Sequence, residues 1–98
     1  YSDNTVVKVK QRLRRFFTWC KERGLETLEA ISRAVIESYQ RYLFHYRQPR
    51  NGRPLTSRTQ FGYLTAIKRY FSFLAKKHFI IYNPAAELDM PRIERSLA

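Results

Sequence analysis

Apolar residues recur along this chain with the period of amphipathic helices, and no stretch alternates as a β-strand does. In the first quarter of the chain they are spaced by three and four residues until a glycine, Gly24, ends the pattern. We therefore expect a first helix that begins near Ser2 or Asn4, both favourable N-cap residues, and stops at Gly24. Its expected core residues are Val6, Val9, Leu13, Phe16, Phe17 and Cys20.

The same period predicts a second and a third helix. Ser32 is a favourable N-cap for the second helix, and the third is expected to start at Ser57, with Gln60 in capping-box position. The connection between them, "RQPRNGRPL", has the prolines and the Asn-Gly pair of a turn. The expected core residues of the two helices are Val35, Ile36, Tyr39, Leu43, Tyr46, Leu64, Ile67, Phe71 and Leu74, with Leu25, Leu28 and Ile31 covering the core from the first connection.

A short fourth helix is expected near the end of the chain. Asn83 can cap it and Pro84 can occupy its first position, while Pro91 would end it. The chain has 98 residues, of which 44% are hydrophobic, enough for one domain with one core. We thus predict an all-α, compact four-helix bundle over residues 1–90 and a linker that starts in residues 91–98.

The positive charge of the chain indicates that this bundle has a polyanionic partner. The net charge is +11 and the isoelectric point is about 10.3. Residues 38–86 contain no Asp or Glu. The cations in this span are Arg41, Arg47, Arg50, Arg53, Arg58, Lys68, Arg69, Lys76 and Lys77. A half-domain of one sign repels itself, and this favours contact with phosphates.

Polar and basic residues form strips opposite the expected core. The strip of the first helix is Asn4, Lys8, Gln11, Arg12 and Arg15; that of the third is Arg58, Gly62, Thr65, Arg69, Ser72 and Lys76. Asn, Gln and Arg can hydrogen-bond base edges, while Lys and Arg also bind phosphates. The two helices could grip a major groove together. The alternative at this point is an ordinary solvated face that is basic.

Several other classes of function find no support in the sequence. No run approaches the roughly 18 apolar residues of a membrane span, the N-terminus is no signal peptide, and a single cysteine fits a reducing cytoplasm. His45 and His78 have no partners at metal-ligand spacing, and no nucleophile stands with a base and an orienting acid. Trp19 is interpreted as a core-edge residue. We expect no cofactor, no metal and no catalytic residue in this chain.

The order of four segments resembles the N-terminal core-binding domain of tyrosine recombinases, the family of phage integrases, Xer recombinases, integron integrases and Cre. The segments are "SDNTVVKVKQRLRRFFTWCKERGL", "AISRAVIESYQRYL", "GRPLTSRTQFGYLTAIKRYFSFL" and "IIYNPAAEL". The shared features are a Thr-led first helix ending near "FxxWC", a Thr soon after the third helix begins, and a closing "NPA". The resemblance covers nearly the whole chain.

This resemblance implies a SAM-like bundle that forms half of a C-shaped clamp on double-stranded DNA, with the first and third helices across the major groove near the crossover site. Carried over by position, the contacts would come from Asn4, Thr5, Lys8, Arg58, Thr59 and Gly62. The family's catalytic tyrosine, Arg and His belong to a larger C-terminal domain, so the resemblance assigns none of the tyrosines here as the nucleophile. Neighbouring recombinase protomers on DNA are the second expected partner, and the isolated fragment is expected to be a monomer in the bacterial cytoplasm, at the nucleoid.

Two alternatives to a recombinase module stay open at this point. A helical DNA-binding domain of another, transcription-factor-like family would carry a similar basic face. A protein-interaction bundle could present the same face to an acidic partner. Duplex binding separates the second alternative from the other two readings.

Overall fold

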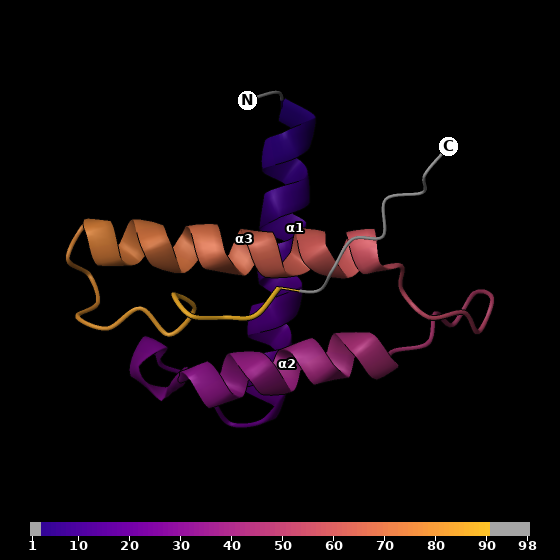
Figure 1. Ribbon diagram of the computed structural model, residues 1–98, viewed down its shortest axis with the longest axis horizontal. Coiled ribbons are helices and arrows are strands. Elements are labelled where there is room, and N and C mark those ends of the chain that lie inside the picture. The colour runs from indigo at the N-terminus through magenta and orange to yellow at the C-terminus, as the bar shows by residue number, and fades with distance from the viewer. Residues whose placement is uncertain (1–2, 91–98) are drawn as a thin grey trace.

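The computed structural model describes residues 3–90, and its regular elements are helices (Figure 1). They are α1 (Asp3–Glu22), the short 3-10 helix η1 (Leu28–Ala30), α2 (Arg33–His45) and α3 (Ser57–Lys76). In Figure 1, α2 and α3 run in opposite directions and α1 crosses both. The first turns of α1 project beyond α3, and among the described helices α3 is the neighbour of the N-terminal half of α1.

The predicted C-terminal end of the first helix and the start of the second are confirmed. At the other end, α1 already includes Asp3, so Asn4 lies within the helix, and Ser2 lies outside the described residues. Gly24 has φ +75°, and its N–H donates to the carbonyl of Lys21 while the Leu25 N–H donates to that of Cys20, both at 3.0 Å. These two bonds close the last turn of α1 in a Schellman motif. At α2, the hydroxyl of Ser32 accepts the N–H of Val35 at 3.3 Å.

The start of α3 differs from the prediction in its cap. Thr56, one residue before the expected start, is the N-cap, and its Oγ1 accepts the N–H of Thr59 at 3.1 Å. Gln60 takes no part in a capping box. It is buried, and its Nε2 donates to the carbonyl of Leu55 at 3.0 Å. Both Thr and Ser are good caps, so the pattern alone could not choose between adjacent hydroxyls.

The connection between α2 and α3 is the expected tight turn, and it projects from the bundle (Figure 1). The N–H of Gln48 donates to the carbonyl of Arg53 at 2.9 Å, and the N–H of Gly52 donates back to Gln48 at 2.7 Å. Gly52 has φ +68°, a conformation that a residue with a Cβ rarely adopts. The turn presents three exposed cations, Arg47, Arg50 and Arg53.

The core is built around stacked and edge-on aromatic rings from α1 and α2. The centroid of the Phe16 ring lies 4.9 Å from that of Tyr39, and the Trp19 ring lies 5.1 Å from Tyr39. Trp19 is only 6% exposed, so it is a core residue rather than an edge residue. The other buried residues expected from the pattern are Cys20, Ile31, Ile36, Leu43, Leu64, Ile67, Phe71 and Leu74.

The prediction of Val6 as a core residue was wrong. Its side chain is 42% exposed, because the first turns of α1 extend past α3 and have nothing to pack against. Cys20, by contrast, is fully packed, and burial raises the pKa of its thiol to about 11. The thiol therefore stays protonated near neutral pH, as expected of a small hydrophobic residue.

The predicted fourth helix does not form. Residues 84–87 make a turn, in which Asn83 Oδ1 accepts the N–H of Ala85 at 2.9 Å. A helix of this length gains too few hydrogen bonds to repay the cost of nucleation. The segment instead buries Ala85 and Leu88 against the core. The fold is therefore all-α, as predicted, but with three α-helices and one 3-10 turn; the expected end at Pro91 and the expected linker lie outside the described residues.

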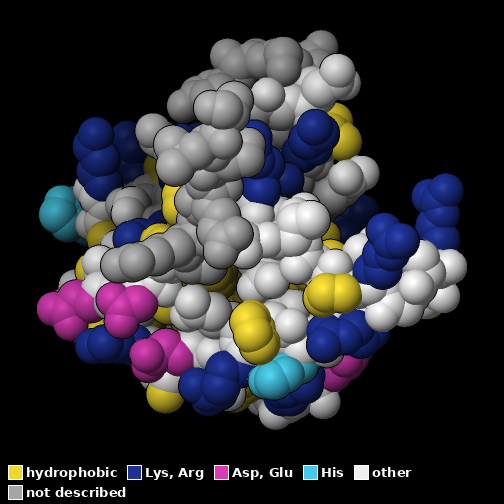
Figure 2. Space-filling model, turned by 45° about the vertical axis from the view of Figure 1, so that its right-hand side comes forward, with side chains coloured by type: hydrophobic (Ala, Val, Ile, Leu, Met, Phe, Trp, Pro, Cys, Tyr) yellow, Lys and Arg dark blue, Asp and Glu magenta, His cyan; other side chains and the backbone are white. Residues whose placement is uncertain are grey.

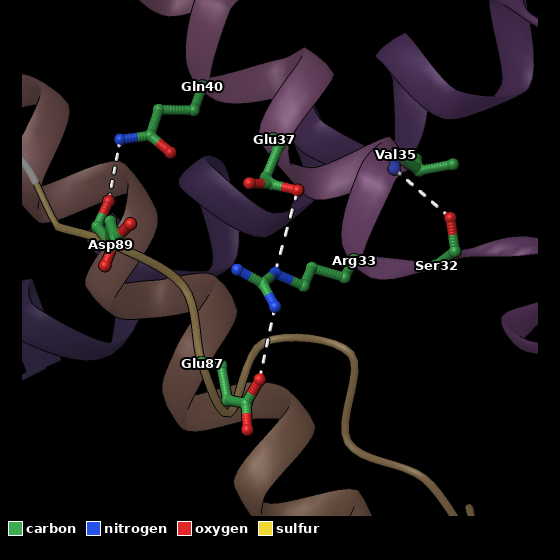
Figure 3. Close-up of polar contacts among 7 residues, drawn as sticks. All are labelled: Ser32, Arg33, Val35, Glu37, Gln40, Glu87 and Asp89. Atoms are coloured by element: carbon green, nitrogen blue, oxygen red, sulfur yellow. Dashed lines mark hydrogen bonds and ion pairs between the residues drawn. The ribbon is translucent and has the colours of Figure 1, made fainter.

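Polar contacts hold this last segment against α2 (Figure 3). Gln40 Nε2 donates to the carbonyl of Asp89 at 2.8 Å. Arg33 pairs with Glu37 at 3.7 Å and with Glu87 at 3.2 Å. The side chains of the two ion pairs are 41–79% exposed, so these pairs stabilise the fold only slightly, and the buried side chains contribute more.

Replacing Tyr39 with Phe should leave the free energy of unfolding unchanged or raise it slightly. The Tyr39 hydroxyl is buried without a hydrogen-bond partner among the described residues, and burial raises its pKa. Its removal ends a desolvation cost and leaves the ring contacts intact. Tyr39→Ala, which removes the ring, should cost about 3–5 kcal/mol in urea denaturation. A loss above about 1 kcal/mol for Tyr39→Phe would mean that the hydroxyl has a partner in solution.

Candidate nucleic-acid interface

A groove of about 230 Å³ lies where α1 crosses α3, and we call it the crossing groove. Half of the twelve residues predicted to bind DNA line this groove, although the two helices that carry them are far apart in sequence. The residues that line the groove are Thr5, Lys8, Val9 and Arg12 from α1 and Phe61, Gly62, Thr65, Ala66 and Arg69 from α3.

Two small residues of α3 face α1 at this point. Gly62 and Ala66 are one turn apart, so they share a face of the helix. Ala66 is 3% exposed, and an alanine buried on that face lets the neighbouring helix lie close. Gly62 makes room for a side chain of α1, since the atoms nearest to its missing Cβ belong to the Arg12 guanidinium.

The electrostatics of the crossing groove are of one sign. Lys8, Arg12 and Arg69 line it, and none of its lining residues is acidic. Of the acids in the first half of the chain, Asp3 opens α1, and the others lie at the end of α1, along the connection to α2 and on α2 itself. Figure 2 shows the acidic side chains of one face gathered in the lower half of the view. Between Asp3 and Glu22, α1 carries no acidic residue.

Other predicted contact residues lie outside the crossing groove. Asn4 is exposed in the first turn of α1, and Arg58 is exposed in the first turn of α3, where Thr59 belongs to the helix cap. Lys76 is in the last turn of α3, roughly 10 Å along the axis from Arg69. α1 crosses α3 nearer its N-terminal half, so the end of the strip is not covered.

Gln11 and Arg15 line a different hollow, of about 330 Å³, on the side of α1 that faces α2. The Arg15 guanidinium donates to the Tyr63 hydroxyl at 3.2 Å and lies 4.5 Å from the centroid of the Tyr46 ring. Burial alone would lower the pKa of Arg15, but its bonds to tyrosine hydroxyls outweigh this and raise the pKa above its ordinary value. Arg15 thus links α1 to α3 and to the end of α2.

Sequence reasoning missed four residues of this region: Val9, Phe61, Ala66 and Tyr63. Val9 was assigned to the core, but it is half-buried and forms part of the groove wall. Tyr63 packs partly buried against the core, and its ring also receives the Arg12 guanidinium at 5.6 Å. The one available signal was the spacing of Gly62 and Ala66, which marks a close helix contact.

Two larger hollows lie elsewhere on the described part of the chain. One, of about 370 Å³, is apolar and lies beside the exposed Phe79, Ile81 and Tyr82. The other, of about 500 Å³, is wide and carries Arg23 and Arg41 among aromatic rings. Over residues 3–90 no group of acidic, His and Cys side chains could hold a metal ion, and no helix is long and apolar enough to cross a membrane.

Comparison with known proteins gives a family and several relatives. Residues 1–78 match the family described as phage integrase, N-terminal SAM-like domain. Tyrosine recombinase XerC 2 of Ralstonia nicotianae is 47% identical over 97 residues, which are 99% of this chain and 28% of that protein. Tyrosine recombinase XerC of two Leptospira interrogans serovars, copenhageni and Lai, is 25% identical over 97 residues, or 99% of this chain and 29% of theirs. No solved structure matches. The chain therefore spans less than a third of the length of these relatives.

Replacing Arg15 with Ala should lower the free energy of unfolding by about 1–2 kcal/mol, because the chain loses a half-buried cation–π contact and the hydrogen bond to Tyr63. Arg14→Ala is the matched control, since Arg14 is exposed on the same helix and its loss should change stability by less than about 0.5 kcal/mol. Urea denaturation of both variants measures the difference. Equal effects of the two substitutions would contradict the structural role of Arg15.

Proposed function

This chain belongs to the phage integrase N-terminal SAM-like domain family, and we propose that it is the DNA-binding module of a site-specific tyrosine recombinase. The module grips duplex DNA near the crossover site through α1 and α3 and so supports DNA integration and recombination. The observation that carries this proposal is the crossing groove, which joins Lys8 and Arg12 of α1 to Arg69 of α3 without an acidic neighbour in its lining.

Physical chemistry supports duplex DNA as the partner. The cationic side chains of a one-signed surface repel each other, and phosphates remove this cost while their counterions are released. The projecting half of α1 exposes Asn4, Lys8 and Gln11 of its polar strip, and a major groove of about 12 Å admits a helix. Thr65 adds a hydroxyl that can bond a phosphate between the cations of the groove.

The DNA contacts we propose extend beyond the crossing groove. They are Asn4, Thr5, Lys8, Gln11, Arg12, Arg15, Arg58, Thr59, Gly62, Thr65, Arg69 and Lys76. Arg58 and Asn4 stand at the exposed first turns of the two helices, where they can reach the backbone on either side. Arg15 would contribute as a fixed charge, since tyrosines hold its guanidinium.

The strand-transfer chemistry would belong to another part of the full-length protein. The relatives are named tyrosine recombinases, and this chain matches 28–29% of their length. We assign no catalytic residue to it. Neighbouring protomers on the same DNA are the second partner we propose, in the cytoplasm of a bacterium.

Membership of the family replaces the alternative of an unrelated helical DNA-binding domain. The alternative of a protein-interaction bundle has one observation in its favour, the exposed Phe79, Ile81 and Tyr82 beside an apolar hollow. This apolar surface is distinct from the basic one, so protein contacts and DNA binding can coexist.

Replacing Lys8 and Arg69 together with Ala should weaken duplex binding by about tenfold and reduce the slope of log K against log salt by roughly 2, because two phosphate contacts are lost. Lys21→Ala with Arg41→Ala is the matched control: it also removes two exposed cations, but at positions outside the crossing groove. Fluorescence anisotropy with a labelled duplex at two salt concentrations measures both. Equal losses would show only a general charge effect, and a wild-type chain without affinity for DNA would contradict the proposed function.

A further inference from the structure

Gly62 lies directly beneath the guanidinium of Arg12. A Cβ placed on Gly62 would lie 2.8 Å from Nη1, 2.9 Å from Cζ and 3.0 Å from Nη2 of Arg12. These three atoms are the nearest to that position, and their similar distances mean that the guanidinium turns its face toward α3. The guanidinium of Arg12 therefore packs against the backbone of Gly62, which has no side chain to displace it.

The remaining surroundings of Arg12 hold its guanidinium without using its donors. The Tyr63 ring lies 5.6 Å away and stabilises the cation through its π face. No hydrogen bond or ion pair joins the guanidinium of Arg12 to any residue between 3 and 90. The side chain is half-buried in the wall of the crossing groove, so a planar fork of donors is fixed in place and left available.

We propose that Arg12 is the residue of this domain that reads a guanine in the major groove, and that Gly62 is the positioning residue that makes this possible. The inference rests on the proposed DNA-binding function and deepens it. A guanidinium donates two parallel hydrogen bonds to O6 and N7 of guanine, and no other base offers two acceptors in that arrangement. Holding the fork before binding removes the entropy cost of ordering a long side chain.

The proposal also predicts how Gly62→Ala affects the stability of the fold. Glycine is among the least favourable residues in the interior of a helix, so alanine would stabilise α3 if space allowed. The atoms that a methyl group meets first are the end of a flexible side chain, not the backbone of α1. Alanine at this position should thus displace the guanidinium and leave the two helices packed.

The test is a double-mutant cycle of Gly62→Ala and Arg12→Ala, with Thr27→Ala as a control at an exposed residue outside α1 and α3. A duplex is first selected by the wild-type chain from a library of random sequence. We expect Gly62→Ala and Arg12→Ala each to lower affinity for this duplex by about tenfold and to abolish the preference for guanine at one position. The double variant should bind no worse than Arg12→Ala, because the glycine acts only through the arginine. Thr27→Ala should bind as the wild type does.

Arg12→Lys keeps the positive charge, removes the planar set of guanidinium donors, and changes no residue of α3. It should keep most of the salt-dependent affinity and lose the guanine preference. The proposal is overturned if Gly62→Ala or Arg12→Lys retains that preference, or if the losses of the two alanine variants multiply in the double variant. Thermal denaturation should show that Gly62→Ala melts at or above the wild-type temperature; a lower melting temperature would also contradict the proposal, since it would mean that the methyl group separates the helices. If these variants retain the guanine preference while Lys8→Ala with Arg69→Ala still weakens binding, only this inference fails. The proposed function fails if the wild-type chain does not bind DNA.

Discussion

The crossing of α1 over α3 is the constraint on which both the fold and the candidate site depend. At this point α3 offers Gly62 and the buried Ala66, so the helices approach closely and the guanidinium of Arg12 lies against the backbone of α3. One turn farther along α1, Arg15 binds Tyr63 and stacks on the Tyr46 ring. Two arginines of one helix thus differ in their contacts: Arg15 binds residues of α3 and of the end of α2, whereas Arg12 lines the crossing groove.

The charge distribution follows from the same crossing. The half of α1 that packs against α2 ends among Glu22, Glu26 and Glu29, whereas the half that projects beyond α3 carries Lys8 and Arg12. The acid-free stretch of residues 38–86 then supplies the cations of α3 and of the turn before it. The fold therefore brings Lys8 and Arg12 of α1 beside Arg69 of α3, in a groove that has no acidic lining residue.

Much of the fold could be predicted because it depends on local signals. The period of Leu64, Ile67, Phe71 and Leu74 defines the buried side of α3, and the conformation required of Gly24 ends α1. The predictions failed where burial or secondary structure depends on a tertiary contact. Val6 continues the apolar period but has no partner beyond α3, and the turn at Asn83 is too short to remain helical once Ala85 and Leu88 are buried.

The candidate site, too, could be predicted only in part from the sequence. The strips on α1 and α3 could be read from helical spacing, but the point where the helices meet could not, because it depends on packing of residues far apart in the chain. For this reason Arg15 and Lys76 were grouped with Lys8 and Arg69, although the structure separates them. Gly62 appeared on the strip as a residue without a side chain to offer, and only the structure reveals Arg12 above it.

The central claim, that duplex DNA lies against the crossing groove, is tested most directly by following the backbone amide signals of the ¹⁵N-labelled chain during titration with a DNA duplex. The account predicts that the largest shifts fall in residues 5–12 of α1 and residues 61–69 of α3, two segments that meet only at the groove. Shifts concentrated around Arg23, Arg41 and His45, which surround the other basic hollow, would contradict it.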